Sequence, residues 1–446
     1  MSRLQRLREA VERHQRRKDH ARVSGLVTEV AASHCRVFGL SDFVELGECV
    51  RFGSPRDERL GQVVKVGKDG AIVKSFDDRA RVGLNTPAFR AGPIEVAPHP
   101  DWVGRVLDAF ARPVDDRGPL AEGDLALQVD TSAPPAMRRA RVTTPVRTGV
   151  KAVDCFTPIC AGQRIGVFAG SGVGKSTLLG MLARAPGFDL AIICLVGERG
   201  REVREFLEEA MSATHARDSI TIVATGDESP MMRRLAPLTA TTIAEYFRDI
   251  GRNVLLIVDS VTRFAHASRE VALAAGEPPV AHGYTPSVFA DIPRLLERAG
   301  PGEEGKGTIT GVFSVLVDGD NHNDPIADCV RGTLDGHIVL DRAIAEQGRY
   351  PAIDIKTSIS RLAHHAWRPE QRHLVQKLRA LVSRFEDTRD LRMLGGYQKG
   401  SDPELDQAVQ LVPKLYEAVC QSPQSPPSMD PFREVADRLQ QAGAQG

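Results

Sequence analysis

The 446-residue sequence lacks the long hydrophobic segments of membrane-bound and exported proteins. No apolar run approaches the ~18 residues that a membrane-spanning helix needs. The Arg-rich start of the chain leads into no apolar stretch like that of a signal peptide. We therefore expect a protein that the ordinary secretory route does not export.

Cysteine is scarce and is not arranged in pairs. The seven cysteines are scattered along the chain, and none stands in a Cys-x-x-Cys pair. This pattern argues against a disulfide framework and against a structural zinc site. We expect free thiols in the reducing environment of the cytoplasm.

The chain has no excess of charge of either sign. Lys plus Arg and Asp plus Glu each number 58, and aromatic residues make up only 5% of the sequence. Proteins that bind nucleic acid depend on a basic surface and commonly on aromatic residues that stack on bases. We therefore expect no nucleic-acid partner.

The length predicts about three domains, at roughly 150 residues each. Residues 1–20 hold seven basic and three acidic residues, with apolar residues spaced along one side of a helix. One interpretation is an amphipathic helix that docks on a partner, and the other is a frayed, solvated end. From 21 to 96, short β-branched runs such as 62–66 and 71–76 are separated by the turn-rich tetrad 67–70. This pattern predicts a small antiparallel barrel or sandwich, and we assign the segment as a β-barrel domain.

The middle of the chain, residues 97–365, alternates short apolar runs with amphipathic segments. Strands that are apolar on both faces indicate a parallel sheet covered by helices on each side, which is an α/β fold. In residues 366–446, Leu374, Leu378, Leu381 and Phe385 recur at helical spacing, and Ser401-Asp402-Pro403-Glu404 is typical of a helix start. We therefore predict a C-terminal helical domain.

The most informative segment of the α/β region is AGSGVGKS, residues 169–176, which follows an apolar run and precedes a predicted helix. This is the context of a phosphate-binding loop, in which glycines let successive amide groups converge on phosphate oxygens. The strict pattern begins with glycine, and Ala169 is a small departure. The predicted nucleotide-binding residues are Gly170, Ser171, Gly172, Val173, Gly174, Lys175, Ser176 and Thr177. Lys175 is expected to reach the terminal phosphates and the Ser176 hydroxyl to bind Mg²⁺.

Two further carboxylates follow apolar runs. Asp259 ends the run 254–258, and a carboxylate at a neighbouring strand end can complete the magnesium site. Glu198 follows the run 191–196, at a position where α/β folds place catalytic groups. From its spacing alone, Glu198 is equally well interpreted as a group that orients water or as a solvated loop charge.

These segments resemble the catalytic subunits of rotary ATPases and their relatives that energise flagellar and type III protein export. The resemblance extends over most of the chain from about residue 100. The matching stretches are GRVLDAFARPVDD (104–116), GQRIGVFAGSGVGKST (162–177), VGERGRE (196–202), LLIVDSVTRFA (255–265), GYTPSVF (283–289), GDNHNDPIAD (319–328), DGHIVLDRAIAEQGRYPAID (335–354) and SISRLA (358–363).

The resemblance implies a role for individual residues. Glu198 is similar to the family's water-activating glutamate, and Arg199 and Arg263 are similar to its phosphate-site arginines. Tyr350 matches the tyrosine that packs on adenine. Arg361 resembles the arginine finger that reaches the terminal phosphate of the neighbouring subunit. The cofactors implied are ATP and Mg²⁺, and the implied assembly is a homohexameric ring.

Within this superfamily, GGYQKGSDPELDQAV (395–409) resembles the export branch, and GDNHNDPIAD resembles the flagellar type. The resemblance implies peripheral association with the inner face of the cytoplasmic membrane. The implied partners are a regulatory or stator subunit bound through the N-terminal helix, the export gate, a central stalk protein and complexes of export chaperones with their substrates. The alternatives are a virulence type III secretion ATPase, an ATP synthase catalytic subunit and, ranked last, a ring translocase acting on RNA or DNA.

Overall fold

The computed structural model describes residues 23–54, 59–77, 82–210, 218–317 and 324–443. The helix predicted over residues 1–20 lies outside these residues. The chain divides into two compact units: the first contains the chain up to Ile94 together with Val271–Glu277, and the second contains Glu95–Glu270 and Pro278–Gly446.

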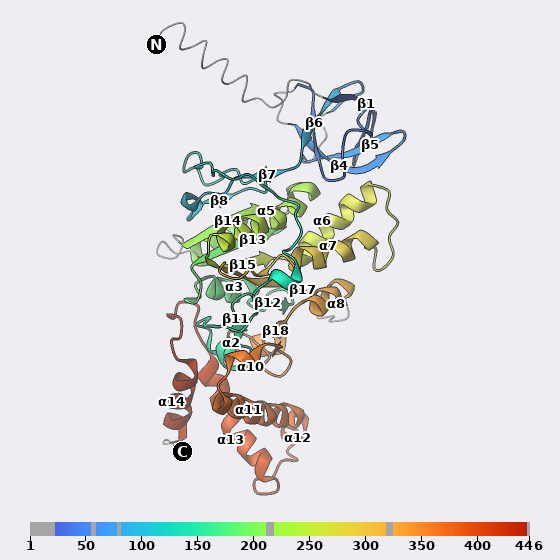
Figure 1. Ribbon diagram of the computed structural model, residues 1–446. Helices are drawn as coiled ribbons and strands as arrows, with labels where there is room; N and C mark the ends of the chain where they lie inside the picture. The colour runs from blue at the N-terminus through green and yellow to red at the C-terminus, as the bar shows by residue number, and fades with distance from the viewer. Residues whose placement is uncertain (1–22, 55–58, 78–81, 211–217, 318–323, 444–446) are drawn as a thin grey trace, which may run out of the picture. The chain divides into compact units, whose positions relative to one another are not determined.

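The first unit is built on a closed antiparallel β-barrel with the strand order β1-β2-β5-β4-β3-β6 (Figure 1). Its strands are β1 (Ser24–Val30), β2 (Cys35–Phe38), β3 (Cys49–Phe52), β4 (Leu60–Gly67), β5 (Gly70–Ser75) and β6 (Pro87–Gly92). Alternate side chains such as Val27, Val37 and Phe52 fill its core. Gly70, at a φ of 126°, closes the β4–β5 hairpin at the predicted turn. The predicted β-barrel is confirmed.

The second unit centres on a nine-stranded sheet with the order β19-β18-β12-β17-β15-β13-β14-β8, on which β16 pairs with β17. Neighbours from β18 to β8 are parallel, whereas β19 and β16 pair antiparallel. The strands are β8 (Val106–Leu107), β12 (Arg164–Ala169), β13 (Leu190–Val196), β14 (Ser219–Ala224), β15 (Asn253–Asp259), β16 (Gly300–Pro301), β17 (Thr308–Leu316), β18 (Gly336–Leu340) and β19 (Ile359–Ser360). The predicted parallel sheet is confirmed.

Helices of this unit cover the sheet and carry its connections (Figure 1). Helix α5 packs on β13, β14 and β15, and α3 packs on α4. The helices are α2 (Lys151–Phe156), α3 (Lys175–Ala183), α4 (Gly200–Ala210), α5 (Pro230–Asp249), α6 (Val261–Ala274), α7 (Pro286–Leu296), α8 (Pro325–Thr333), α9 (Arg342–Glu346) and α10 (Ala363–Ala366). The short elements β7 (Glu95–Val96), η1 (Pro100–Trp102), β9 (Leu127–Gln128), η2 (Ala136–Arg138), β10 (Pro145–Val146) and β11 (Ile159–Cys160) complete the fold before β12.

The C-terminal part is helical, as the sequence predicts. It contains α11 (Pro369–Asp387), α12 (Arg389–Met393), α13 (Pro403–Val419) and α14 (Pro431–Gly443), with α13 packed between α11 and α14. The Asp402 side chain accepts the amide hydrogens of Glu404 and Leu405, so it caps α13 at the predicted start. In the described part of the chain, no helix combines the length and the apolar character that crossing a membrane requires.

The central strands are buried on both faces, and the structure therefore predicts a steep penalty for truncating them. Ile257 in β15 has no exposed surface. Its replacement by Ala should lower the free energy of unfolding by about 2–5 kcal/mol, because a cavity remains where the side chain packed. Urea denaturation of the wild type and the variant measures this loss.

The matched control for this prediction is Ile250→Ala, since the Ile250 side chain is 51% exposed. That change should alter the free energy of unfolding by less than about 0.5 kcal/mol. Equal losses in the two variants would show that β15 is not the interior strand described here.

Candidate functional site

The loop from β12 to α3 forms a cradle at the carboxyl end of a central strand. Gly172 and Gly174 have φ values of 79° and 90°, a region that glycine adopts without strain. Helix α3 begins directly after the loop, so its free amide groups and positive dipole face the same space. This cradle opens on a cavity of about 490 Å³. The cavity is lined by Gly170, Ser171, Gly172, Gly174, Lys175, Ser176, Thr177, Gly197, Glu198, Arg199, Glu202, Arg263, Leu316 and Val317.

The ammonium group of Lys175 faces two carboxylates from neighbouring strand ends. It lies 3.4 Å from Oε1 of Glu198, which follows β13, and it forms a hydrogen-bonded ion pair with Oδ1 of Asp259, the last residue of β15. Only 10% of the Lys175 side chain and 3% of the Asp259 side chain are exposed. Parallel strands bring these groups together because their carboxyl ends meet at one edge of the sheet.

The electrostatic balance of this cluster favours a further cation. Its two carboxylates face one ammonium group, which leaves one formal negative charge in excess. Burial raises the pKa of Glu198 above its usual value of 4.5, and Asp259 adds to that rise, whereas Lys175 lowers this pKa. A divalent cation beside Asp259 would relieve the repulsion between the carboxylates.

The oxygen donors present fit Mg²⁺ rather than a protein-only metal cage. The exposed Ser176 hydroxyl lies in the cavity lining, and Asp259 lies beside Lys175 at the base of the loop. Among the described residues, no group of three or more His, Cys, Asp or Glu side chains could hold a metal ion. Mg²⁺ commonly takes only one or two protein oxygens and completes its shell with water and substrate phosphates.

Two arginines reach the same cavity from different sides. Arg263, in α6, packs its aliphatic carbons against Gly197, where an added Cβ would lie 3.0 Å from the Arg263 Cβ and Cγ atoms. The Nε atom of Arg263 is buried and has no hydrogen-bond partner among the described residues. The Arg199 side chain is 87% exposed and lies 3.7 Å from Glu202. Both guanidinium groups are thus placed to meet an anion in the cavity.

Tyr350 lies beside the phosphate loop. Its ring carbons are 3.5 Å from the position that a Cβ on Gly174 would take, although Tyr350 is not among the residues that line the cavity. The Tyr350 carbonyl accepts a hydrogen bond of 2.9 Å from the amide of Gln421. The segment that follows α13 therefore helps to hold this tyrosine next to the loop.

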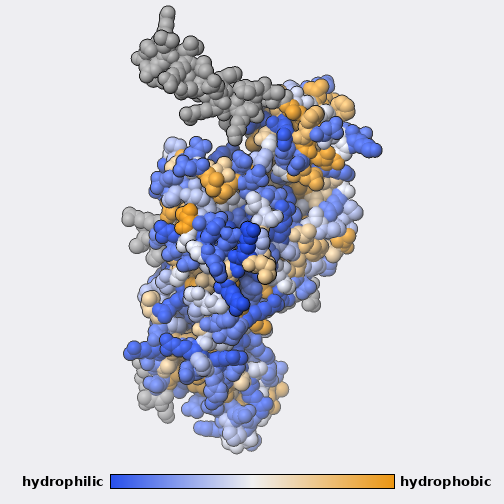
Figure 2. Space-filling view, viewed as in Figure 1, coloured by the Kyte–Doolittle hydropathy of each residue, from blue (hydrophilic) through white to orange (hydrophobic). Residues whose placement is uncertain are grey.

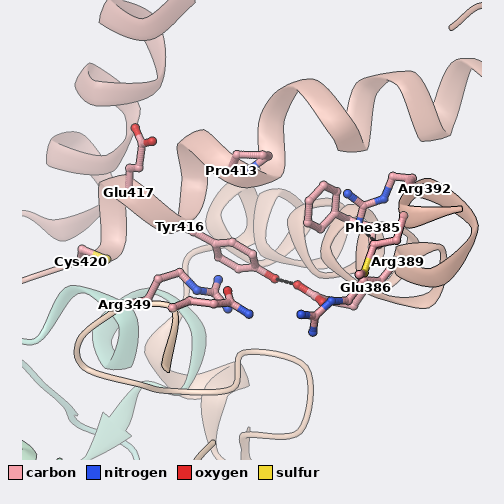
Figure 3. Close-up of a pocket in the computed structure, with 11 residues that line it drawn as sticks. Arg349, Phe385, Glu386, Arg389, Arg392, Pro413, Tyr416, Glu417 and Cys420 are labelled. Carbon is pink, nitrogen blue, oxygen red and sulfur yellow. Dashed lines mark hydrogen bonds between the residues drawn. The ribbon is translucent and has the colours of Figure 1, made fainter. Parts of the chain in front are cut away.

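A second cavity, of about 650 Å³, lies next to this segment in the C-terminal part (Figure 3). The guanidinium of Arg349 stands 3.7 Å from the centre of the Tyr416 ring, and the Tyr416 hydroxyl donates a hydrogen bond of 2.6 Å to Glu386. These contacts tie the loop that carries Tyr350 to helices α11 and α13. The cavity lacks the glycine-rich loop and is separate from the phosphate cradle.

Four predicted residues do not line the cavity: Tyr350 and Asp259, whose surroundings are described above, and Val173 and Arg361. Val173 is buried at 2% exposure behind the loop, so only its backbone is available to a ligand. Arg361 is exposed directly after β19 and does not line the cavity of its own chain. Its guanidinium makes no hydrogen bond or ion pair with any described residue.

The structure adds a residue that the sequence reasoning missed. Ser314, in β17, donates a hydrogen bond of 2.6 Å from its hydroxyl to Oδ1 of Asp259 and is fully buried. This bond and the ion pair with Lys175 both fix the Asp259 carboxylate. The only sequence signal was a hydroxyl within the apolar run 310–317, which by itself does not identify a partner.

Comparisons with known proteins agree with this site. Residues 149–360 match the model of the ATP synthase alpha/beta family nucleotide-binding domain, and residues 367–441 match the T3SS EscN ATPase C-terminal domain. The assembled ATPase EscN from the type III secretion system of enteropathogenic E. coli has a similar structure, with a TM-score of 0.86 and 35% identity, covering 94% of this chain and 99% of EscN. EscN in complex with its central stalk EscO gives a TM-score of 0.83 at 34% identity, with the same coverage of both chains.

The sequence is 60% identical to the flagellum-specific ATP synthase of Agrobacterium fabrum over 364 residues, which are 82% of this chain and 76% of that protein. The match to the nucleotide-binding domain model, over residues 149–360, includes the phosphate loop and the strand ends described above. The chain therefore belongs to the flagellum-specific ATP synthase family, whose fold it shares with type III secretion ATPases.

Proposed function

We propose that the chain hydrolyses Mg-ATP at the loop between β12 and α3 and that this reaction energises flagellar protein export. The observation that carries the proposal is the position of Lys175, at the end of a glycine-rich amide cradle and against Glu198 and Asp259. An ammonium group at this place can exchange its carboxylate partners for the terminal phosphates of a bound nucleotide. The residues that contact the phosphates are those of the loop from Gly170 to Thr177.

We assign the magnesium ion to Ser176 and Asp259. When bound, Mg²⁺ would neutralise charge on the β- and γ-phosphates as the terminal bond breaks. The hydrogen bond from Ser314 and the ion pair with Lys175 hold the Asp259 carboxylate in one orientation.

Glu198 is the group that orients and activates the attacking water. It lies at the cavity wall, within reach of Lys175, and burial raises its pKa toward the neutral range in which a general base works best. Its 18% exposure leaves part of the side chain open to the cavity. A carboxylate in this position suits proton abstraction from water in line with the terminal phosphate.

Charge that develops on the transferring phosphoryl group requires fixed cations. Arg199 and Arg263 supply two from the same chain, and we assign a third to Arg361 of a neighbouring copy. Its exposure, and the lack of a side-chain hydrogen bond or ion pair to any described residue of its own chain, support delivery in trans. Tyr350 is assigned to the adenine ring, because it stands beside the loop at Gly174 with 43% of its surface exposed.

A finger supplied in trans implies a closed ring, since each subunit then gives its arginine to one neighbour and receives one from the other. We propose a homohexamer, supported by the similarity to the assembled ATPase EscN. The barrel exposes large apolar side chains, among them Phe38, Phe43 and Leu46, and Figure 2 shows hydrophobic residues gathered on it. These side chains suit contacts between barrels of adjacent subunits.

The export branch is favoured over an ATP synthase subunit by the C-terminal match over residues 367–441. A central stalk protein is a proposed partner because EscN binds its stalk EscO. We further propose that residues 1–20 bind a regulatory or stator subunit and that residues 21–96 join the ring. Residues 97–365 would hydrolyse ATP. Residues 366–446 would contact the stalk, the export gate and chaperone–substrate complexes. This places the protein in the cytoplasm, at the inner face of the membrane.

The roles of Lys175 and Glu198 predict different defects. Lys175→Ala should abolish ATP binding, because the ammonium contact with the phosphates is lost. Glu198→Gln should bind ATP within about threefold of the wild type while turnover falls by at least about a hundredfold, because general-base catalysis contributes that much. Equilibrium binding of a fluorescent ATP analogue and phosphate release measure the two properties. Equal loss of binding in both variants would contradict the assignments.

The raised pKa of Glu198 predicts a pH-dependent stability difference in the nucleotide-free protein. A carboxyl whose pKa is higher in the folded than in the unfolded state adds stability at low pH, and this stability is lost as the pH rises through the folded value. Because Gln is never ionised, the Tm of Glu198→Gln should rise relative to the wild type as the pH increases above about 4.5. Thermal melts from pH 5 to 8 test this, and a constant difference across that range would contradict it.

Delivery of Arg361 in trans predicts that turnover depends on assembly. The specific activity of the wild type should rise with protein concentration, and Arg361→Ala should lower kcat by about 10³-fold or more, the usual contribution of an arginine finger. The matched control is Arg372→Ala, an exposed arginine on α11, which should leave kcat within about twofold. An activity that is independent of concentration and equal in the wild type and Arg361→Ala would reject the finger.

A further inference from the structure

The backbone around Arg361 is held by a set of hydrogen bonds to other segments. The amide of Arg361 donates to the carbonyl of Asp335 at 2.9 Å, and the hydroxyl of Ser360 accepts from Nε2 of Gln163 at 3.1 Å. On the other side, the Leu362 carbonyl accepts a weak bond from the thiol of Cys160 at 3.8 Å. Arg361 itself is exposed, so the structure fixes the base of this side chain at the surface of the subunit.

Gln163 is the centre of this arrangement and has no exposed surface. Its Oε1 accepts the amide hydrogen of Cys160 at 2.9 Å. Because that amide can only donate, the other side of the carboxamide must be the NH₂ group. This NH₂ group donates one hydrogen bond to the Asp335 carbonyl at 3.3 Å and one to the Ser360 hydroxyl. The buried carboxamide therefore has a partner for its oxygen and for both of its N–H groups.

Asp335 is in turn anchored to the first residue of β12. Its carboxylate accepts from the amide of Arg164 at 3.0 Å and from the Arg164 Nε atom at 3.2 Å. Gly336 lets β19 approach closely, since a Cβ there would lie 2.5 Å from the Ile359 carbonyl oxygen. The amino end of β12 is therefore connected to β19 and Arg361 by the Gln163 side chain and through Asp335.

The carboxyl end of the same strand leads directly into the phosphate loop. Strand β12 runs from Arg164 to Ala169, a span of roughly 17 Å at 3.3 Å per residue. It lies between β17 and β18 and is buried over most of its length. One rigid strand thus carries the phosphate cradle of a subunit at one end and the anchor of its Arg361 at the other.

We propose that Gln163 is the positioning residue that aims Arg361 at the neighbouring subunit's nucleotide, an inference that rests on the proposed trans role of Arg361. Gln163 ties β19 to the start of β12. It therefore fixes the position of Arg361 relative to the strand that carries the phosphate loop of the same subunit. Without this bond, the Ser360 side chain loses its contact with Gln163, and the backbone bonds of β19 to Gly336 and Asp335 are left to set where the Arg361 side chain begins.

Gln163→Leu, which keeps the size of the side chain but removes its hydrogen bonds, tests the proposal in the full-length ring. Its kcat should fall at least about tenfold with KM unchanged, because small displacements of a catalytic group cost that much or more. Its own affinity for a fluorescent ATP analogue should stay within about twofold of the wild type. Phosphate release at ring-forming concentrations gives the rates.

Rings assembled from two different variants distinguish a misplaced Arg361 from damage to the variant's own nucleotide site. Lys175→Ala subunits bind no nucleotide but carry an intact arginine, so next to Gln163→Leu subunits they should restore turnover. In a ring each site receives its arginine from one neighbouring subunit. In a 1:1 mixture, half of the subunits can bind ATP, and half of these receive a correctly positioned arginine. The mixture should therefore reach about one quarter of the wild-type rate. A mixture of Arg361→Ala with Lys175→Ala should behave in the same way.

The outcomes distinguish the two proposals. If the Arg361→Ala mixture regains activity and the Gln163→Leu mixture does not, the positioning role is overturned and the proposed function stands. If the Arg361→Ala mixture gains nothing, the trans finger is rejected together with the role of Gln163. Should Gln163→Leu fail to fold, Ser360→Ala removes the same bond from the other side, and its mixture with Lys175→Ala must gain activity for the proposal to hold.

Thr310→Val is the matched control for the loss of a buried hydrogen bond. The Thr310 hydroxyl accepts the amide hydrogen of Gly162 at 2.9 Å, next to Gln163 in sequence, and is fully buried, but it does not touch β19. This variant should keep kcat within about twofold of the wild type. A loss of kcat as large as that of Gln163→Leu would overturn the proposal.

Discussion

The cluster of Lys175 with Asp259 and Glu198 is the interaction on which the site depends. A nearly buried ammonium group faces two carboxylates, and the excess negative charge is tolerated only where a cation or a change in protonation can balance it. The parallel sheet makes this arrangement possible, since its order brings the ends of β12, β13 and β15 to one edge. Catalytic groups far apart in sequence therefore meet around one cavity.

Much of the fold was predictable because its signals are local. Apolar runs such as 254–258 become buried strands, and Asp402 begins a helix where its side chain can cap the free amides. Contacts between distant segments were not predictable. Leu374 shares the helical spacing of Leu378, yet it is 46% exposed and Val375 is buried instead, because the packing of α13 decides which face of α11 is covered.

In the site, too, the local features could be predicted from the sequence and the contacts between distant segments could not. The glycine-rich loop and its lysine follow from backbone geometry and chain order, whereas the hydrogen bond from Ser314 to Asp259 depends on which strands are neighbours. Nothing in the run 310–317 indicates that β17 would lie beside β15. The anchoring of Arg361 through Gln163 could not be predicted either, because the two residues are far apart in the chain and are connected through Ser360 and the Asp335 carbonyl. Spacing identifies the reactive groups, but the tertiary fold supplies the groups that orient them.

The central claim is that the ammonium group of Lys175 leaves its carboxylate partners to bind the terminal phosphates of ATP. A structure of the assembled protein with Mg²⁺ and a nonhydrolysable ATP analogue tests this most directly. It should show phosphate oxygens on the amides of the β12–α3 loop, Lys175 on the β- and γ-phosphates, and Ser176 and Asp259 around the metal. A nucleotide bound elsewhere, with Lys175 still paired to Asp259, would contradict the account.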